Sequence, residues 1–456
     1  MKFKYICFFA FLSFTQLAYS YNTATIYVNN ILGNDRYDGK SATPNASTGP
    51  VKTIQKALDL VPISGRVEII NTGKPYLSGN KLRKGGTLEK PLIIEGNGAV
   101  ISGLGIVHEN EWTNIEGNIY KRPFWPMSNQ LKSSKEYNTW IGIPEIWRVN
   151  ERPAKNCTSK EELINTPGGF WWNKEEKAVW FNLPKDKKFS DLTIELPLPR
   201  GNGSGMNVSG DFGHIIIKNL RSEFAFNDGF SAHLSVKNLV FKNCIAVNNC
   251  GQGFSMHDKT QVEIEDSFAS RNASSGSCDV GSAEVSYKRT VFVNNSFEAG
   301  IYTTENVNAK YEDCIIVNNR PFEQIWQIGK SNIYLKNCLV VGATDNLSLA
   351  AINNGTIKIE SCTFSNGASI ARFSNTRNGS ISIEKSLFSD LKEIVATKNI
   401  AQISFKNSIT DISNSSFKDS ELTNTKISQK NNFAYHRKFG AQLPASVWKL
   451  YNTYNK

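Results

Sequence analysis

The stretch Phe241–Val247 reads FKNCIAV, and eight further stretches share its order of one apolar residue, two polar residues, a fourth residue and then more apolar positions. Neighbouring stretches are 22 to 24 residues apart. A fixed period of this length is typical of a solenoid, in which one repeat buries its apolar face only by stacking on the next. The fourth residues of the nine stretches are Leu220, Cys244, Ser267, Thr290, Cys314, Cys338, Cys362, Ser386 and Ser408.

Each repeat also contains short segments in which apolar and polar residues alternate, such as Val262–Glu265. Alternation predicts strands, and the period is too short for a propeller blade and too rich in strands for helical repeats. We therefore predict an all-β fold: a single-stranded, right-handed parallel β-helix. A second column, five residues after the fourth residue, predicts a ladder of hydrogen-bonded side chains inside a turn. It consists of Asn249, Asn272, Asn295 and Asn319.

Motifs near the N-terminus resemble those of secreted proteins of the right-handed parallel β-helix superfamily, which includes pectate lyases and related polysaccharide-active enzymes. The motifs are Gly33-Asn34-Asp35, Thr53–Leu58, Pro91–Gly96 and Ala99–Gly103. The resemblance extends over most of the chain and implies an exported, polysaccharide-active protein. Ile54, Ala57 and Leu58 lie on one face of a short helix. We expect this helix to cap the open end of the first coil, where strand edges are unpaired.

The period breaks at residues 105–200, which hold seven of the nine Trp residues. We expect an inserted small β subdomain here, after an N-terminal cap and first coils at 21–104 and before the main repeats at 201–430. For any one Trp, a place in the core of this subdomain is favoured over a sugar-stacking platform. A segment around Trp448 predicts an amphipathic helix that caps the last coil, within a C-terminal cap at 431–456.

Residues 1–20 predict a signal peptide, because two lysines precede a short apolar run and small residues end it at Ala18 and Ser20. The apolar run is too short to span a bilayer. We expect cleavage after Ser20, a secreted or periplasmic protein and no membrane span. A disulfide between Cys250 and Cys278 is left open, and the cysteine spacing does not predict a structural zinc site.

The chain has 52 Lys and Arg against 41 Asp and Glu, a formal net charge of +11. A basic balance favours an acidic partner, and we expect this to be an acidic polysaccharide bound by a monomer. The alternative is that lysines only decorate the surface. Export and the lack of a Lys/Arg block argue against nucleic acid.

Two segments one repeat apart, Asn227–His233 and Gly251–His257, place chemically useful side chains in register. Alternation along a strand turns Phe230 and Phe254 inward and both histidines outward. His233 and His257 are 24 residues apart, so their imidazoles are expected about 5 Å apart on one outer face. Histidine suits proton transfer near neutral pH. The alternative is a solvated sheet face without chemistry.

Two chemistries compete for this face. A glycoside hydrolase needs two carboxylates across the bond, whereas a lyase needs a base for the C5 proton of a uronate and a cation for its carboxylate. Tyr302 is the candidate acid of the lyase. A Ca²⁺ held by the aspartates was also considered, although the sequence lacks the Asp cluster with a following Arg base that calcium pectate lyases have. The candidate catalytic residues are His233, His257, Asp279, Asp228 and Asp258, and the candidate substrate-binding residues are Tyr302, Trp326, Arg271, Arg320 and Lys259.

The competing interpretation from another class is a non-catalytic glycan-binding or cell-surface β-helix protein. The asparagine-rich faces and the Trp set favour it. Binding without release of product would distinguish it from an enzyme.

Overall fold

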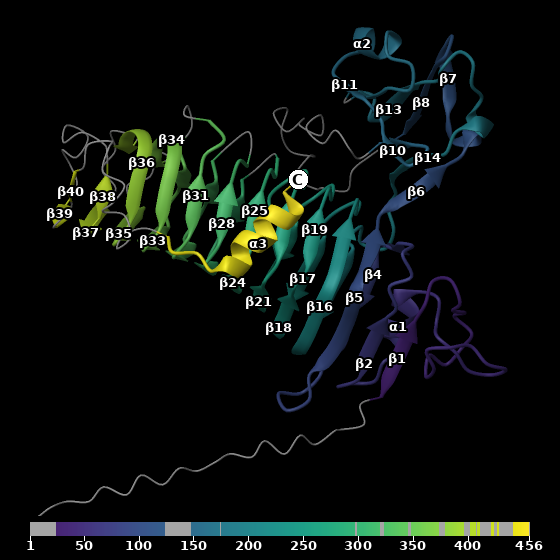
Figure 1. Cartoon of the computed structure of the whole chain (residues 1–456), viewed down its shortest axis with the longest axis horizontal. Coiled ribbons are helices and arrows are strands. Elements are labelled where there is room, and N and C mark those ends of the chain that lie inside the picture. The colour runs from purple at the N-terminus through teal and green to yellow at the C-terminus, as the bar shows by residue number, and fades with distance from the viewer. Residues whose placement is uncertain are drawn as a thin grey trace, which may run out of the picture.

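The chain forms a parallel β-solenoid (Figure 1). The structure, a computed structural model, describes residues 24–123, 147–173, 175–296, 299–319, 323–344, 348–373, 379–395, 402–406, 408–410, 421–423, 426–427 and 441–455. Within them, 31 strands join into one sheet. The strands of one coil pair in parallel with those of the next, as β18–β21–β24 do. The predicted all-β parallel solenoid is therefore confirmed.

Most coils contribute one strand to each of three stacks. The first stack consists of β1 (Thr25–Val28), β2 (Arg66–Ile69), β5 (Leu92–Ser102), β16 (Gly213–Glu223), β18 (Lys237–Lys242), β21 (Gln261–Glu265), β24 (Glu284–Lys288), β27 (Asn308–Glu312), β30 (Asn332–Lys336), β33 (Thr356–Glu360), β35 (Ser380–Glu384), β37 (Gln402–Lys406) and β39 (Glu421–Thr423). The second stack begins with β3 (Tyr76–Leu77) and the ends of β5 and β16. It continues with β19 (Ile245–Val247), β22 (Phe268–Ser270), β25 (Val291–Val293), β28 (Ile315–Val317), β31 (Leu339–Val341), β34 (Thr363–Phe373), β36 (Leu387–Val395), β38 (Ile409–Thr410) and β40 (Lys426–Ile427).

The third stack carries the candidate site. It consists of β4 (Asn80–Leu82), β15 (Met206–Gly210), β17 (Phe230–Leu234), β20 (Phe254–Met256), β23 (Ser277–Asp279), β26 (Ile301–Thr303), β29 (Ile325–Gln327) and β32 (Ala350–Ile352), followed by the end of β34.

The fourth residue of each repeat forms the corner between the first two stacks. Asp266, just before it, has φ of 49°, a left-handed conformation that Asp and Asn tolerate better than most residues. Ser267 is fully buried, and its Oγ donates to the carbonyl of Glu265 at 2.6 Å. The cysteines of this column are fully buried at the same corner, as expected for small apolar residues.

The asparagine ladder is confirmed. Asn249 Nδ2 donates to Asn272 Oδ1 at 2.9 Å, and Asn272 Nδ2 donates to Asn295 Oδ1 at 2.9 Å. Asn295 bonds Asn319 in the same way at 3.0 Å. The ladder ends on Gln324, whose Oε1 accepts from Asn319 Nδ2 at 2.8 Å.

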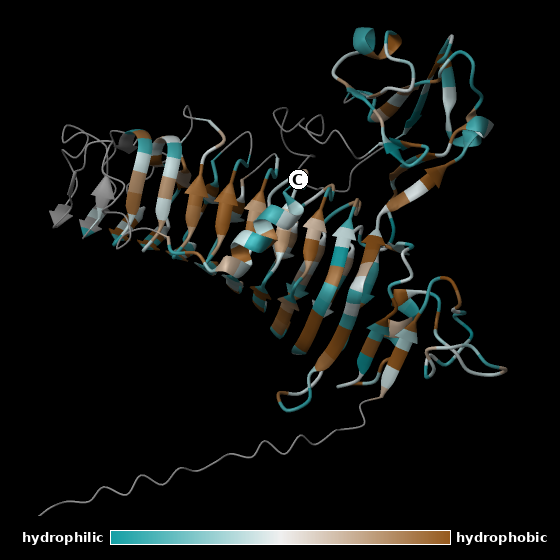
Figure 2. Ribbon diagram, viewed as in Figure 1, coloured by the Kyte–Doolittle hydropathy of each residue, from teal (hydrophilic) through white to brown (hydrophobic). Residues whose placement is uncertain are grey.

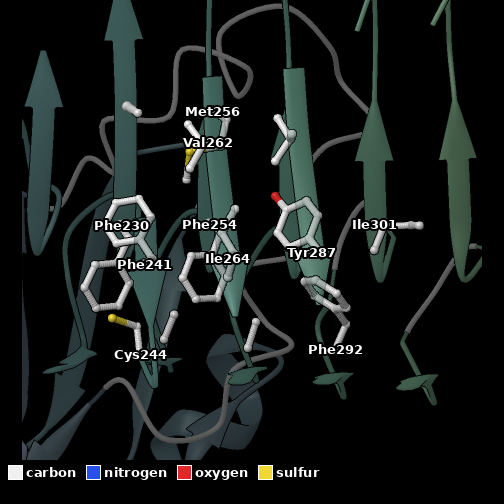
Figure 3. Packing of buried hydrophobic residues seen from close by; sticks show 14 of the residues in the cluster. Phe230, Phe241, Cys244, Phe254, Met256, Val262, Ile264, Tyr287, Phe292 and Ile301 are labelled. Atoms are coloured by element: carbon white, nitrogen blue, oxygen red, sulfur yellow. The ribbon is translucent and has the colours of Figure 1, made fainter. Parts of the chain in front are cut away.

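Apolar side chains fill the inside of the coils and stack from one coil to the next (Figure 3). Phe230 and Phe254 stack with ring centroids 5.5 Å apart. Figure 2 shows apolar and polar positions alternating along the long strands β5 and β16, whereas the short strands β25, β28 and β31 are apolar throughout.

The nine strands between Leu104 and Pro197 form two smaller sheets outside the solenoid sheet (Figure 1). One contains β6 (Leu104–Val107), β9 (Arg148–Val149), β10 (Arg152–Pro153) and β14 (Ile194–Pro197). The other contains β7 (Thr113–Glu116), β8 (Ile119–Pro123), β11 (Asn156–Cys157), β12 (Phe170–Asn173) and β13 (Ala178–Asn182), and α2 (Lys160–Ile164) packs beside it.

The tryptophans of these sheets are mainly core residues. Trp112, Trp147 and Trp172 share a buried cluster with Phe226 of the solenoid, and Trp180 is buried in a second cluster. Trp125 and Trp140 lie outside the described residues. Cys250 belongs to the first cluster, and both Cys250 and Cys278 are buried thiols that are not joined in a disulfide. The disulfide left open above is therefore absent from the structure.

Two further helices lie against the solenoid. In α1 (Ile54–Leu60), Ile54, Ala57 and Leu58 join the solenoid core, and Thr53 Oγ1 accepts from the Lys56 N–H at the helix start. No helix among the described residues has both the length and the apolar content to cross a bilayer.

The helix α3 (Ala445–Tyr454) corrects the expected cap of the last coil. It lies along the side of the middle coils, against β22 and β25 (Figure 1). Val447 is fully buried there with Phe268 and Val291. Asn294 Nδ2 also donates to Asn455 Oδ1 at 3.0 Å. The apolar outer face of these short strands binds the helix, so the helix covers a side of the solenoid and not its end.

Candidate functional site

The two histidines stack on the outer face of the third stack, as the repeat predicts. Strands β17 and β20 pair so that Phe230 lies beside Phe254 and Ala232 beside Met256, all in the core. The imidazoles of His233 and His257 therefore leave the opposite face, with ring centroids 4.5 Å apart and planes 24° apart. Both side chains are half-buried.

A serine and an aspartate fix the neighbourhood of this pair. Ser255 Oγ lies 2.8 Å from His257 Nε2, within hydrogen-bond distance. Asp258 Oδ2 accepts from the Leu234 N–H at 2.8 Å, which ties the turn after β20 to the previous coil. Asp258 itself is exposed and has φ of 59°.

The surroundings favour the neutral imidazoles. The pKa of His257 is lowered to about 4, mainly by burial and in part by the adjacent His233, against the opposing effect of Asp258. Burial also lowers the pKa of His233, Asp258 opposes this, and Lys81 adds to the lowering. Desolvation penalises the charged ring. At pH 7 both rings are therefore unprotonated and able to accept a proton.

Lys81 is a member of this site that sequence reasoning missed. It lies on β4 beside Asn207 of β15, and Asn207 lies beside Ser231 of β17. Asn207 Nδ2 donates to Ser231 Oγ at 2.8 Å. Because residues 104–197 separate β4 from β15, no 24-residue step leads from Lys81 to the repeats. The half-buried lysine brings a cation to the histidine face.

Asp279 does not lie on this face, which corrects the sequence-based placement. Its register partner is Met256, a core residue, and Asp279 is fully buried. Tyr287 Oη donates to Asp279 Oδ1 at 2.9 Å, and Tyr311 Oη donates to Oδ2 at 3.3 Å. Burial raises the pKa of Asp279 to about 8. This carboxyl group is part of the internal packing and cannot reach a polysaccharide on the outside.

Asp228 is a turn residue, which is a second correction. It is 3% exposed and precedes β17 at the end away from His233. Its Oδ1 accepts from the Gln252 N–H at 3.0 Å, and its Oδ2 accepts from Asn227 Nδ2 at 3.1 Å. Asp228, Asp258 and Asp279 thus occupy three different places and do not form the calcium site considered above. No metal-binding group of three or more His, Cys, Asp or Glu occurs among the described residues.

The candidate substrate-binding residues Arg271 and Lys259 lie at opposite ends of the third-stack strands. Arg271 follows β22 and donates from Nε to Asn248 Oδ1 at 3.0 Å, at the corner away from the histidines. Lys259 is exposed directly after Asp258. Arg320 lies outside the described residues.

Two aromatic side chains continue the histidine face along the solenoid. Tyr302 lies beside Cys278, which lies beside Ser255. Trp326 follows Tyr302 in register, and their rings meet edge to face at a centroid distance of 5.4 Å. The outer face thus carries, in order along the coils, Lys81, the histidine pair and an aromatic pair.

Comparisons with known proteins find matches among solved structures. No family model and no curated protein matches the chain. A solved structure described as "Glycoside hydrolase" is similar with a TM-score of 0.45 and 10% identity, over 94% of this chain and 98% of that one. Pectate lyase Pel9A is similar with a TM-score of 0.41 and 10% identity, over 89% and 80%. XylC, solved with xylose, is similar with a TM-score of 0.41 and 11% identity, over 85% of this chain and 68% of that one.

The parallel register of the strands defines the fold class of this chain by itself. The function must be argued from the site itself.

Proposed function

We propose that the chain is a secreted enzyme that cleaves an acidic polysaccharide by β-elimination on the face of His233 and His257. The observation that carries the proposal is the stacked imidazole pair, whose pKa values lie below neutrality. An unprotonated, partly exposed imidazole can accept a proton from carbon without first losing one.

The chemistry uses the described side chains as follows. His257 takes the C5 proton of a uronate, the C–H electrons form the C4–C5 double bond, and the C4–O bond breaks. The imidazolium so formed is a strong acid because of its low pKa, and it returns the proton to the leaving oxygen. Lys81 offsets the negative charge that develops on the sugar carboxylate. Tyr302, the acid expected from the sequence, lies two strands from Ser255, about 10 Å away, and is assigned to substrate binding instead.

Hydrolysis is less well supported by this face. A hydrolase requires two carboxyl groups about 5 to 10 Å apart. Asp279 is in the core and Asp228 is held in a turn, so Asp258 is the one carboxylate of the expected set beside the histidines.

The aromatic pair Tyr302 and Trp326 favours a second candidate, non-catalytic glycan binding on the same face. The test is incubation with a panel of acidic and neutral polysaccharides. An unsaturated product that absorbs near-ultraviolet light supports elimination, and reducing ends without this absorbance support hydrolysis. Retention without any product supports binding alone.

We assign residues 1–20 to a signal peptide cleaved after Ser20, α1 to a cap of the first coil, and residues 105–200 to an inserted subdomain. The coil winding is assigned as right-handed and the protein as a monomer. The net charge of +11, which falls to +9 when Lys2 and Lys4 leave with the signal peptide, supports an acidic substrate.

A further inference from the structure

A second polar cluster lies on the outer face of the third stack, beyond the aromatic pair. Ile325, Ala350 and Ala371 are core residues. Their neighbours Trp326, Ala351 and Arg372 are partners in register and therefore share the outer face. Ala351 lies between Trp326 and Arg372 in this register, so its small side chain separates the indole of Trp326 from the Cβ atom of Arg372.

The Arg372 side chain reaches back across Ala351 to a buried carboxylate. Its Nε donates to Oε1 of Glu323, two residues before β29. The side chain of Glu323 is 2% exposed, whereas that of Arg372 is 39% exposed. The arginine is thus accessible at its outer side while it holds the carboxylate beneath it.

One oxygen of this carboxylate lacks a partner. Glu323 Oε2 is buried and makes no hydrogen bond within the part of the chain that the structure describes. A buried carboxylate oxygen without a donor is costly, and native structures rarely keep one without a reason. Among the described residues, Arg372 is therefore the group that balances the charge of this buried carboxylate.

A comparable trio of a carboxylate, a cation and an aromatic ring lies on another side of the same coils, and there the carboxylate has its hydrogen-bond donor. Glu360 Oε2 accepts from Tyr334 Oη at 2.5 Å, and Lys358 Nζ lies 5.0 Å from the centre of the Tyr334 ring. There the aromatic residue itself donates to the carboxylate. In the Glu323 cluster the carboxylate is held by the cation, Arg372, and not by the aromatic residue.

We propose that Trp326, Arg372 and Glu323 form a sugar-binding subsite for the polysaccharide bound by the histidine face. The apolar face of a sugar ring packs on the indole. An oxygen of the same sugar, hydroxyl or carboxylate, accepts from the outer edge of the Arg372 guanidinium, which Glu323 holds in place from the buried side.

The position fits a chain that runs along the solenoid. β29 is three strands beyond β20, about 14 Å along the stack. A sugar on Trp326 therefore belongs to the same extended polysaccharide as the sugar at His257. The inference deepens the proposed function and rests on it for the identity of the ligand.

The test measures retention of the full-length protein in affinity gels that contain pectate, alginate or xylan. The wild type is expected to be retarded by at least one of these polysaccharides. Trp326→Ala and Glu323→Gln are each expected to weaken binding about tenfold. Trp448→Ala, at an exposed Trp of α3, and Glu360→Gln, in the completed trio, are expected to bind like the wild type.

Each outcome decides the proposal. Wild-type affinity in Trp326→Ala overturns it, and so does a wild type that none of the three gels retards. Glu323→Gln is interpreted alongside its unfolding transition; if it does not fold, Trp326→Ala and Arg372→Gln carry the test, because both side chains are partly exposed. A protein whose binding depends on Trp326 but which makes no product keeps the subsite and refutes the elimination chemistry.

Discussion

The imidazole of His257 lies on that of His233, 24 residues earlier in the chain, with ring centroids 4.5 Å apart. The contact follows from the pairing of β17 with β20, and it places two bases on the outer face of one stack. Four predictions follow from this face and from the residues packed behind it.

Replacement of His257 by Ala removes the proposed base. Activity on the substrate polysaccharide should fall by about 10²-fold or more, while the unfolding transition stays close to that of the wild type because the ring is only half-buried. The measurement is the initial rate of unsaturated product formation. Lys237→Ala, at an exposed position of β18 in the first stack, is the control, and a rate in His257→Ala equal to that control would refute the role.

The pH profile should report the low pKa of His257. A base must be unprotonated to act, so kcat/KM should be level around neutral pH and fall as the pH drops through about 4. An acid limb centred at 6 to 7 would mean that the active base keeps the ordinary pKa of a solvated histidine.

Removal of Lys81 should have two effects. The pKa of His233 should rise, because Lys81 contributes to its lowering, and KM for an acidic polysaccharide should increase. NMR titration of the His233 ring measures the first effect, and steady-state kinetics of Lys81→Ala measures the second. Lys81→Arg keeps the charge and is expected to restore much of the affinity. An unchanged titration would separate Lys81 from the site.

Asp279→Asn should keep activity and change the pH dependence of stability. The folded-state pKa of Asp279 is raised to about 8, above its ordinary value of 3.8. Between these values the folded state binds more protons than the unfolded state, so the stabilising contribution is full below about 4 and is lost as pH rises to 8. The slope contributed by one group is at most about 1.4 kcal/mol per pH unit.

Urea unfolding between pH 5 and 8 measures that slope. Asn keeps an acceptor for Tyr287 and does not ionise, so the loss of stability with rising pH should be smaller in the variant. Full loss of activity in a folded Asp279→Asn would return this residue to the active face.

The repeat pattern carries most of what could be predicted about the fold and the histidine pair. The period defines the register, and the register alone places His233 beside His257 and connects the asparagine ladder. These features depend on spacing and side-chain type, which are visible in the chain.

The sequence-based placement of Asp279 was wrong because one repeat is a residue shorter than its neighbour. The step from Met256 to Asp279 is 23 residues, whereas the step from His233 to His257 is 24. Successive side chains of a strand point to opposite faces, so a shift of one residue turns a side chain from solvent to core. An outward aspartate was expected where the structure has an inward one.

Lys81 and the Glu323–Arg372 pair could not be found from periodicity. The inserted sheets separate Lys81 from its neighbour Asn207. Glu323 lies in a turn outside the strands, and its partner is 49 residues away, across two coils whose turns differ in length. Contacts made by long side chains across irregular turns have no spacing rule to reveal them.

The most direct test of the central claim is product analysis with the polysaccharide panel, comparing the wild type with His257→Ala. The account predicts near-ultraviolet absorbance that grows with time on an acidic polysaccharide for the wild type and is nearly absent for the variant. New reducing ends without that absorbance, or no product from any acidic polysaccharide, would contradict it.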